Sequence, residues 1–221
     1  MALLHKKSQE IPEDAVKLNE TQAVLYFMKI VEGWDNKWES WPLIHSPGIL
    51  GATTVVSSIY INSHYRNKLK LGNYGRLSSY IPAVVLPAIM TTFFHKMYVV
   101  PEVTLNRQQC PVCIQVRAGL FQAGFSTIYP MLLAPLSAFM FATRHFTYRL
   151  PSITEQPREV LTLYRKMTRP ITLAVTGLLA FNLMLSMFLT GSEIESVYKI
   201  NLKLLELERR VDSGDLEQLS Q

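Results

Sequence analysis

The segment "ITLAVTGLLAFNLMLSMFLT", residues 171–190, carries no charged side chain, and Asn182 is its only strongly polar residue. An α-helix needs about 20 mostly apolar residues to cross the roughly 30 Å of hydrocarbon in a bilayer. A helix of this length in a soluble protein would place charges on the face turned to water. The segment therefore predicts a transmembrane helix.

Three further stretches without Asp, Glu, Lys or Arg precede this segment, at residues 40–64, 77–95 and 118–143. The charged fraction of the chain is 18%, below the ~25% that is typical of soluble domains. A soluble helical bundle is the alternative, but four such gaps argue against it. We therefore expect an all-α polytopic membrane protein with four transmembrane helices, near residues 45–62, 77–94, 118–141 and 171–190. The first of these is the least apolar, because it is rich in Ser, Thr and Gly.

The two ends of the chain are expected to be amphipathic helices outside the bilayer. Residues 1–44 form an N-terminal interfacial segment with a helix over 13–32, and residues 191–221 form a polar helical tail. Trp34, Trp38 and Trp41 have the spacing of one helical face, and Trp prefers the membrane interface. The stripe predicts an interfacial anchor, with a partner-docking face as the alternative. The tail could be either a solvated end or a partner surface.

The loops differ in charge, which indicates an orientation. Residues 64–76 and 144–170 are basic, whereas the tails and the middle loop are acidic on balance. The positive-inside rule then places these two loops on the side from which charge is not translocated, which in a mitochondrion is the matrix. Both tails would face the intermembrane space. Residues 1–39 contain no Arg and seven acids, so we do not expect a cleavable presequence.

Motifs of catalysis are missing from the sequence. It contains no P-loop, G-x-G-x-x-G, G-x-S-x-G or H-E-x-x-H, so we assign no catalytic residue and expect no enzyme. The histidines are scattered at positions 5, 45, 64, 95 and 145, and interfacial histidines are a simpler interpretation than a bis-histidine cofactor site. We expect no cofactor, no metal and no nucleic-acid partner. No charge is expected well inside a span, which argues against a pump or coupled transporter.

The two cysteines, Cys110 and Cys113, form a single C-x-x-C motif. A structural zinc site needs about four ligands, so one pair is half a site. A thioredoxin-type centre needs a βαβ fold, which the sequence does not indicate. A local disulfide, two free thiols and half of an intermolecular site remain open. Arg117 follows at the start of the third span, where it could snorkel to lipid headgroups or pair with a partner carboxylate.

Small residues recur at four-residue spacing in the expected spans, which places them on one helical face and lets backbones approach closely. The prolines in the second and third spans predict kinks. The pairs are Gly48 with Ala52, Gly119 with Ala123, and Ala134 with Ala138; Arg117, Tyr129 and Pro130 are further candidates for packing or partner contacts.

Ordered motifs give the chain a family resemblance over residues 45–200. "NSHYR" at 62–66 closes the first expected span, and "IPAVVLP" at 81–87 holds paired prolines. "CPVCIQVRAGL" at 110–120 leads to Tyr129-Pro130, and "RP" and "GSE" bracket the last span. In these motifs the chain resembles the transmembrane protein 126 family of mitochondrial inner-membrane proteins.

The resemblance implies a function that the residues alone do not. Members of that family are assembly factors for respiratory complex I, which bind newly made membrane-arm subunits and other assembly factors. The C-x-x-C motif favours the A-type member, which is linked to the distal membrane module and to the insertase. Two alternatives stay open: a small transporter or channel using Gln122 and Asn182, and a membrane thiol oxidoreductase using Cys110 and Cys113.

Overall fold

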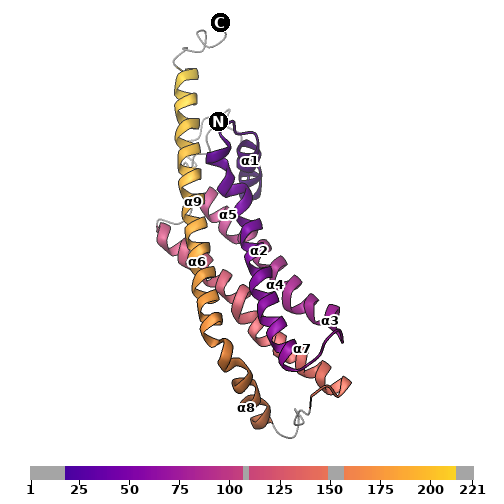
Figure 1. Cartoon of the computed structure of the whole chain (residues 1–221). Coiled ribbons are helices and arrows are strands. Elements are labelled where there is room, and N and C mark those ends of the chain that lie inside the picture. Colours follow the sequence, from indigo (N-terminus) through magenta and orange to yellow (C-terminus); the bar gives the residue numbers. More distant parts are fainter. Residues whose placement is uncertain (1–17, 107–109, 149–156, 213–221) are drawn as a thin grey trace.

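The computed structural model describes residues 18–106, 110–148 and 157–212, and these residues form helices joined by short turns. Four long helical rods lie side by side in an elongated bundle (Figure 1). The first rod is helix α2, Lys37–Lys68, and the second runs from α3, Arg76–Tyr80, through α4, Leu86–Phe94, to α5, Val100–Thr104. The third joins α6, Pro111–Ala123, to α7, Tyr129–His145, and the fourth is α9, Thr172–Asp212.

Three helical stretches, which overlap the second, third and fourth rods, are long and apolar enough to cross a membrane. They are Arg76–Thr104, Pro111–His145 and Arg158–Arg210, which contain the second, third and fourth expected spans. Each is longer than expected, because helix continues past the charged residues that bound the apolar stretch. The residues that the structure describes thus form an all-helical membrane protein with three candidate spans.

Helix α2 occupies the centre of the bundle, where it packs against α4, α7 and α9. Its polar side chains are buried, whereas its exposed face carries large apolar residues. The average hydropathy of α2 is low because the polar groups lie inside the bundle, although its outer face suits lipid. The buried polar residues are Ser46, Thr54, Ser57, Ser58 and Asn62, and the exposed apolar residues include Ile44, Val56, Ile59 and Tyr60.

Wide π-helical turns accommodate three of the prolines in the bundle. The turns are η2, Ile81–Val85, η3, His95–Val99, and η4, Gly124–Ile128. Each is followed two residues later by a proline, and the residue before that proline donates its N–H to the carbonyl five residues back, as Tyr129 does to Gly124. Since proline cannot donate an i→i−4 bond and its ring crowds that carbonyl, the wider turn relieves the clash without ending the helix.

At one end of the bundle, α1, Glu20–Glu32, packs against α2 and α5, in an apolar cluster that also includes the extension of α9 (Figure 1). Asn19 and Gln22 form a capping box at the start of α1, and residues 13–17 of the expected helix lie outside the described residues. Phe27 and Val31 of α1 belong to one apolar cluster with Val197, Ile200 and Leu204 of α9. Residues 191–212 of the expected tail are helical and continue α9 without a break, as one helix of 41 residues that is about 60 Å long, and residues 213–221 lie outside the described residues.

The three tryptophans do not form one helical face. Trp34 lies in the turn between α1 and α2, where its Nε1–H donates to Glu39 Oε2 over 3.0 Å. Trp38 is 85% exposed on α2, and Trp41 is half-buried. The expected stripe is broken because a turn, and not a helix, contains Trp34.

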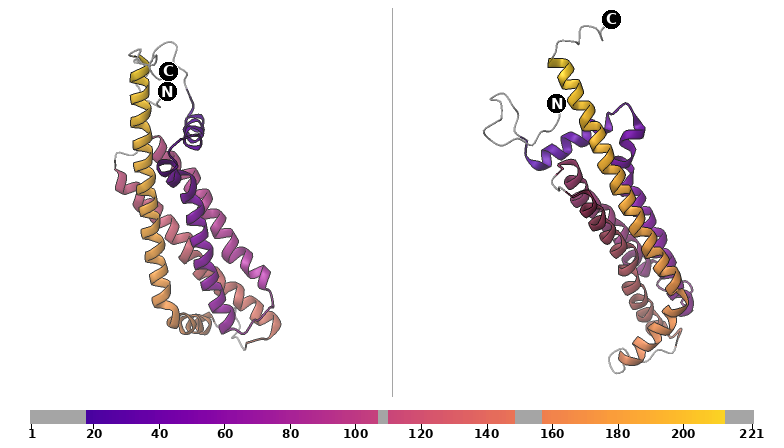
Figure 2. Two further views of the ribbon diagram at one scale, coloured as in Figure 1. Left: turned by 45° about the horizontal axis from the view of Figure 1, so that its top comes forward. Right: turned by 90° about the vertical axis from the view of Figure 1, so that its left-hand side faces the viewer.

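At the opposite end of the bundle, α8, Pro157–Thr168, lies across the ends of the rods (Figure 2). It packs Val160, Leu163 and Tyr164 against an apolar cluster that contains Tyr65. Arg66 closes the α2–α3 loop by donating to the carbonyls of Gly72, Tyr74 and Gly75 and to Ser79 Oγ, at 2.8–3.3 Å.

Candidate functional site

A network of amide side chains joins three rods in the middle of the bundle. Gln122 Nε2, on α6, lies within 3.1–3.3 Å of Leu50 O, Thr53 Oγ1, Thr54 Oγ1 and Asn182 Oδ1. Asn182 Nδ2, on α9, donates to Ser57 Oγ over 3.0 Å and to Leu178 O over 2.9 Å. Gln122 and Asn182 are 2% and 0% exposed, so neither amide group can hydrogen-bond to water outside the protein. The hydrogen bonds within the network satisfy these buried amide groups instead.

A second polar group, the carboxylate cluster, consists of Ser46 on α2, His95 on η3 and Glu193 on α9. His95 Nε2 lies 2.8 Å from Glu193 Oε1, and the Ser46 hydroxyl contacts the same carboxylate oxygen and Pro42 O. Glu193 and Ser46 are 0% exposed, and His95 is 4% exposed. An ionisable group buried inside a membrane bundle is costly and marks a functional site by default.

Glu193 lies three residues beyond the fourth expected span, so the prediction that no charge lies well inside a span did not anticipate this buried carboxylate. The apolar stretch ends at Thr190, but the helix does not, so Glu193 stays on the face that carries Asn182 and Ser186. Residues spaced by three or four positions share one helical face. That spacing of polar residues was the signal in the sequence that could have indicated the site.

Several buried polar atoms of the core lack a hydrogen-bond partner within the described part of the chain. They lie along the seam between the carboxylate cluster and the amide network, and beyond it on α2. Buried polar groups are ordinarily satisfied, so these atoms indicate places for ordered water. They are Glu193 Oε2, Thr190 Oγ1, Ser186 Oγ, Gln122 Oε1, Ser58 Oγ, and Asn62 Nδ2 and Oδ1.

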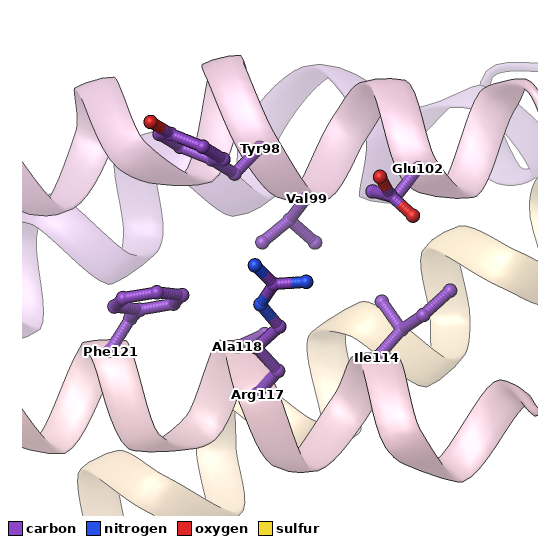
Figure 3. A pocket seen from close by; sticks show the side chains of 7 residues that line it. All are labelled: Tyr98, Val99, Glu102, Ile114, Arg117, Ala118 and Phe121. Atoms are coloured by element: carbon purple, nitrogen blue, oxygen red, sulfur yellow. The ribbon is translucent and has the colours of Figure 1, made fainter. Parts of the chain in front are cut away.

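A surface groove runs between the second and third rods near this cluster (Figure 3). The guanidinium of Arg117, on α6, reaches from its helix toward Val99, with Tyr98 and Phe121 to one side and Glu102 to the other. The space open to small molecules in the groove is about 30 Å³. Arg117 thus lines a groove that has both charged and aromatic side chains. Whether its guanidinium binds a lipid headgroup or a partner carboxylate stays open.

An inner cavity of about 10 Å³ adjoins that groove. Val99, Ala118 and Phe121 line both spaces, so the two are neighbours behind a common wall. The inner cavity is the size that one water molecule needs. Its remaining lining is mostly polar and connects the carboxylate cluster with the amide network: Thr91, His95, Gln122, Ser186 and Phe125.

Cys110 and Cys113 lie exposed at the start of α6 as free thiols. A hydrogen bond from the Cys113 thiol lowers the pKa of Cys110 below the ordinary cysteine value, and Cys110 occupies the position just before the helix N-terminus. Both features favour a thiolate at the first cysteine of such a motif. The local disulfide stays a prediction.

The small residues of α6 form a close contact with α9. A Cβ on Gly119 would lie 3.0 Å from Met187 Cγ and 3.2 Å from Leu183 O, and Ala123 is buried on the same face. Ala134 and Ala138 are also buried, in the cluster that contains Tyr65 of α2.

The pair on α2 does not pack inside the bundle. Gly48 and Ala52 are exposed, and a Cβ on Gly48 would meet nothing within 4 Å. The close contact of α2 is made by Gly51, where a Cβ would lie 2.6 Å from Thr92 Oγ1. Gly48 and Ala52 face outward and remain candidates for partner contact. The spacing of small residues alone could not tell which glycine of α2 faces the interior.

The remaining candidates have separate surroundings. Tyr129 is half-buried and Pro130 is buried, directly after η4. His64 contacts Met167 O over 3.0 Å, and His145 stacks on Tyr74 at the same end of the bundle. Among the described residues, no group of three or more His, Cys, Asp or Glu side chains could hold a metal ion.

Comparison with known proteins assigns the family. The family model "Transmembrane protein 126" matches residues 29–209. A relative named "Transmembrane protein 126", from Drosophila melanogaster, is 48% identical over 219 residues, which is 99% of this chain and 98% of that protein. No solved structure matches. The chain belongs to the transmembrane protein 126 family.

Proposed function

We propose that this protein is a non-enzymatic assembly factor for the membrane arm of mitochondrial complex I, located in the inner membrane. It would hold newly inserted membrane subunits and other assembly factors, including the insertase, while modules are joined. The family resemblance supplies the biological role, and the outer surface of the bundle supplies the physical means.

The observation that carries the proposal is the unpacked face of α9. In the most apolar 18-residue window of Arg158–Arg210, only 17% is buried inside the protein. Leu173, Met184 and Phe188 are 88%, 68% and 67% exposed. A helix with one face free along its length can contact lipid or another membrane helix.

Two exposed glycines make helix contact specific. A Cβ at Gly177 on α9 or at Gly48 on α2 would meet nothing within 4 Å. In a bilayer there is little hydrophobic drive to join helices, so close backbone approach at small residues supplies much of the attraction. These positions are where we expect a partner helix to dock.

We further propose that α2 is the fourth span. Its 32 residues reach about 48 Å, and its apolar residues face outward as lipid requires. With four spans, α1 and the end of α9 share one side, in agreement with their contact. Following loop charge, residues 64–76 and 144–170 face the matrix and both tails face the intermembrane space.

Affinity purification tests the proposal. The full chain, tagged and extracted from mitochondria in mild detergent, should bring down complex I membrane-arm subunits and assembly factors. Gly177→Leu should weaken this recovery severalfold while Gly177→Ala retains most of it, because only the longer side chain keeps a second backbone away. Recovery of the wild-type chain alone would contradict the proposal.

The polar core favours a second candidate, a small transporter or channel. Gln122, Asn182 and Glu193 supply the intramembrane polar groups that such a protein needs. Purified chain in liposomes would then carry an ion or proton flux that Asn182→Leu abolishes. Liposomes that contain the chain and show no such flux would exclude the transporter or channel and would not affect the assembly role.

A further inference from the structure

We propose that the carboxylate cluster, Ser46, His95 and Glu193, is a buried proton-binding site that exchanges protons with water through the groove at Arg117. This activity lies outside the assembly role and does not depend on it. The cluster is nine-tenths or more buried, and the Oε2 atom of Glu193 has no partner among the described residues.

Burial is the first step of the argument. An ionised carboxylate in an apolar interior is strongly disfavoured unless it is paired or neutralised. Within the described residues, Glu193 meets His95 and the Ser46 hydroxyl, and only Oε1 is engaged. One proton shared between the imidazole and the carboxyl makes the pair neutral, and removing that proton leaves a buried negative charge.

Access is the second step. His95 lines the inner cavity, which has room for one water molecule and is also lined by Thr91, Gln122 and Ser186. That cavity shares Val99 with the surface groove. The groove is bordered by Glu102 and Arg117 (Figure 3), and Val99, Ala118 and Phe121 line both the groove and the cavity beside the imidazole.

The proton can move through the imidazole ring. With neutral His95, the Nε2–H donates to ionised Glu193 at 2.8 Å. The ring accepts a proton at Nδ1 from cavity water, and the Nε2 proton passes to Glu193 Oε1. The ring is then neutral with its proton on Nδ1, the carboxyl is neutral, and bulk water returns the proton that the cavity water lost. The cluster has gained one proton, and its charge has risen from −1 to 0.

Other ionisable groups lie on the elements that carry the cluster or pack against it. Glu195 and Lys199 pair with each other at 2.6 Å and are both more than half exposed, so they serve as solvated controls. The groups to be considered are Glu39 and His45 on α2, Lys96 and Tyr98 on η3, Glu102 on α5, Arg117 on α6, and Glu195 and Lys199 on α9.

Infrared spectroscopy tests proton binding, because it needs no reagent to reach the buried carboxyl group. The full chain in lipid nanodiscs would be compared between pH 5 and 9. The C=O stretching band of a protonated carboxyl group should be present at the acidic end and decrease about tenfold per pH unit above its midpoint. Glu193→Gln should remove this band, and Glu195→Gln should leave it unchanged. A Glu193 band that does not change with pH, or no such band at any pH, overturns the proposal.

Two further measurements do not depend on the Glu193 variant. His95→Leu should change the pH at which the carboxyl band is lost, because the imidazole that donates to the carboxylate is gone; an unchanged midpoint would show a merely structural pair. Hydrogen–deuterium exchange at the His95 ring carbon should be slowed severalfold by Val99→Phe, with His145 as internal reference. Exchange unaffected by that substitution excludes the route through the groove.

Discussion

Replacing Gly119 by valine tests the packing of α6 on α9. The Cβ of the new residue would lie 3.0 Å from Met187 Cγ and 3.2 Å from the carbonyl oxygen of Leu183. Met187 can turn aside, but the backbone carbonyl cannot, and two methyl groups follow the Cβ into the same space. Such overpacking costs about 1–3 kcal/mol. For a chain of 221 residues, each kcal/mol lowers the melting temperature by about 2–4 °C.

The matched control is Gly177→Val on α9, where the Cβ meets nothing within 4 Å. Both substitutions replace a helical glycine by the same residue, so the difference between them reports the steric term. Tryptophan fluorescence during heating of the purified chain in detergent should show Gly119→Val melting roughly 2–12 °C below the control. Equal melting temperatures would refute the close contact of these helices.

Three further predictions use the same purified chain. Asn182→Ala should lower the melting temperature by about 2–12 °C, because it leaves buried hydrogen-bonding groups unpaired at a cost of about 1–3 kcal/mol; an unchanged value would contradict the amide network. Iodoacetamide should alkylate Cys110 at lower pH than an ordinary thiol, since its pKa is lowered, and Cys113→Ala should weaken this effect because it removes the hydrogen-bond donor. Hydrogen bonds from Lys203 lower the pKa of Glu39. The contact therefore stabilises the fold near neutral pH, and this stabilisation is lost as the pH falls below the ordinary glutamate range. Glu39→Gln should remove it. Melting curves of that variant and the wild type that differ equally at pH 4 and pH 7 would exclude this contact.

Much of the fold could be predicted from the sequence, because apolar stretches without charge are a direct consequence of bilayer thickness. The second, third and fourth spans were found in this way. Helix α2 was the hardest element to predict as a span, because its Ser, Thr and Asn residues lower its mean hydropathy although they face the interior of the bundle. Hydropathy averages over all faces of a helix, and α2 divides its polar and apolar residues between inside and outside.

The site could not be predicted in the same way. Glu193 follows the last apolar stretch, and its partners Ser46 and His95 lie 147 and 98 positions earlier in the chain. A linear search for charges inside spans excludes such a residue, because it assumes that the buried part of a helix ends where hydrophobicity ends. Small-residue spacing likewise indicated a contact face on α2 but could not select Gly51 over Gly48.

The assembly role is tested most directly by deleting this protein and resolving mitochondrial complexes on a native gel. The account predicts less fully assembled complex I and an accumulation of membrane-arm intermediates, both restored by re-expressing the wild-type chain. A normal amount of complex I in cells that lack the protein entirely would contradict it.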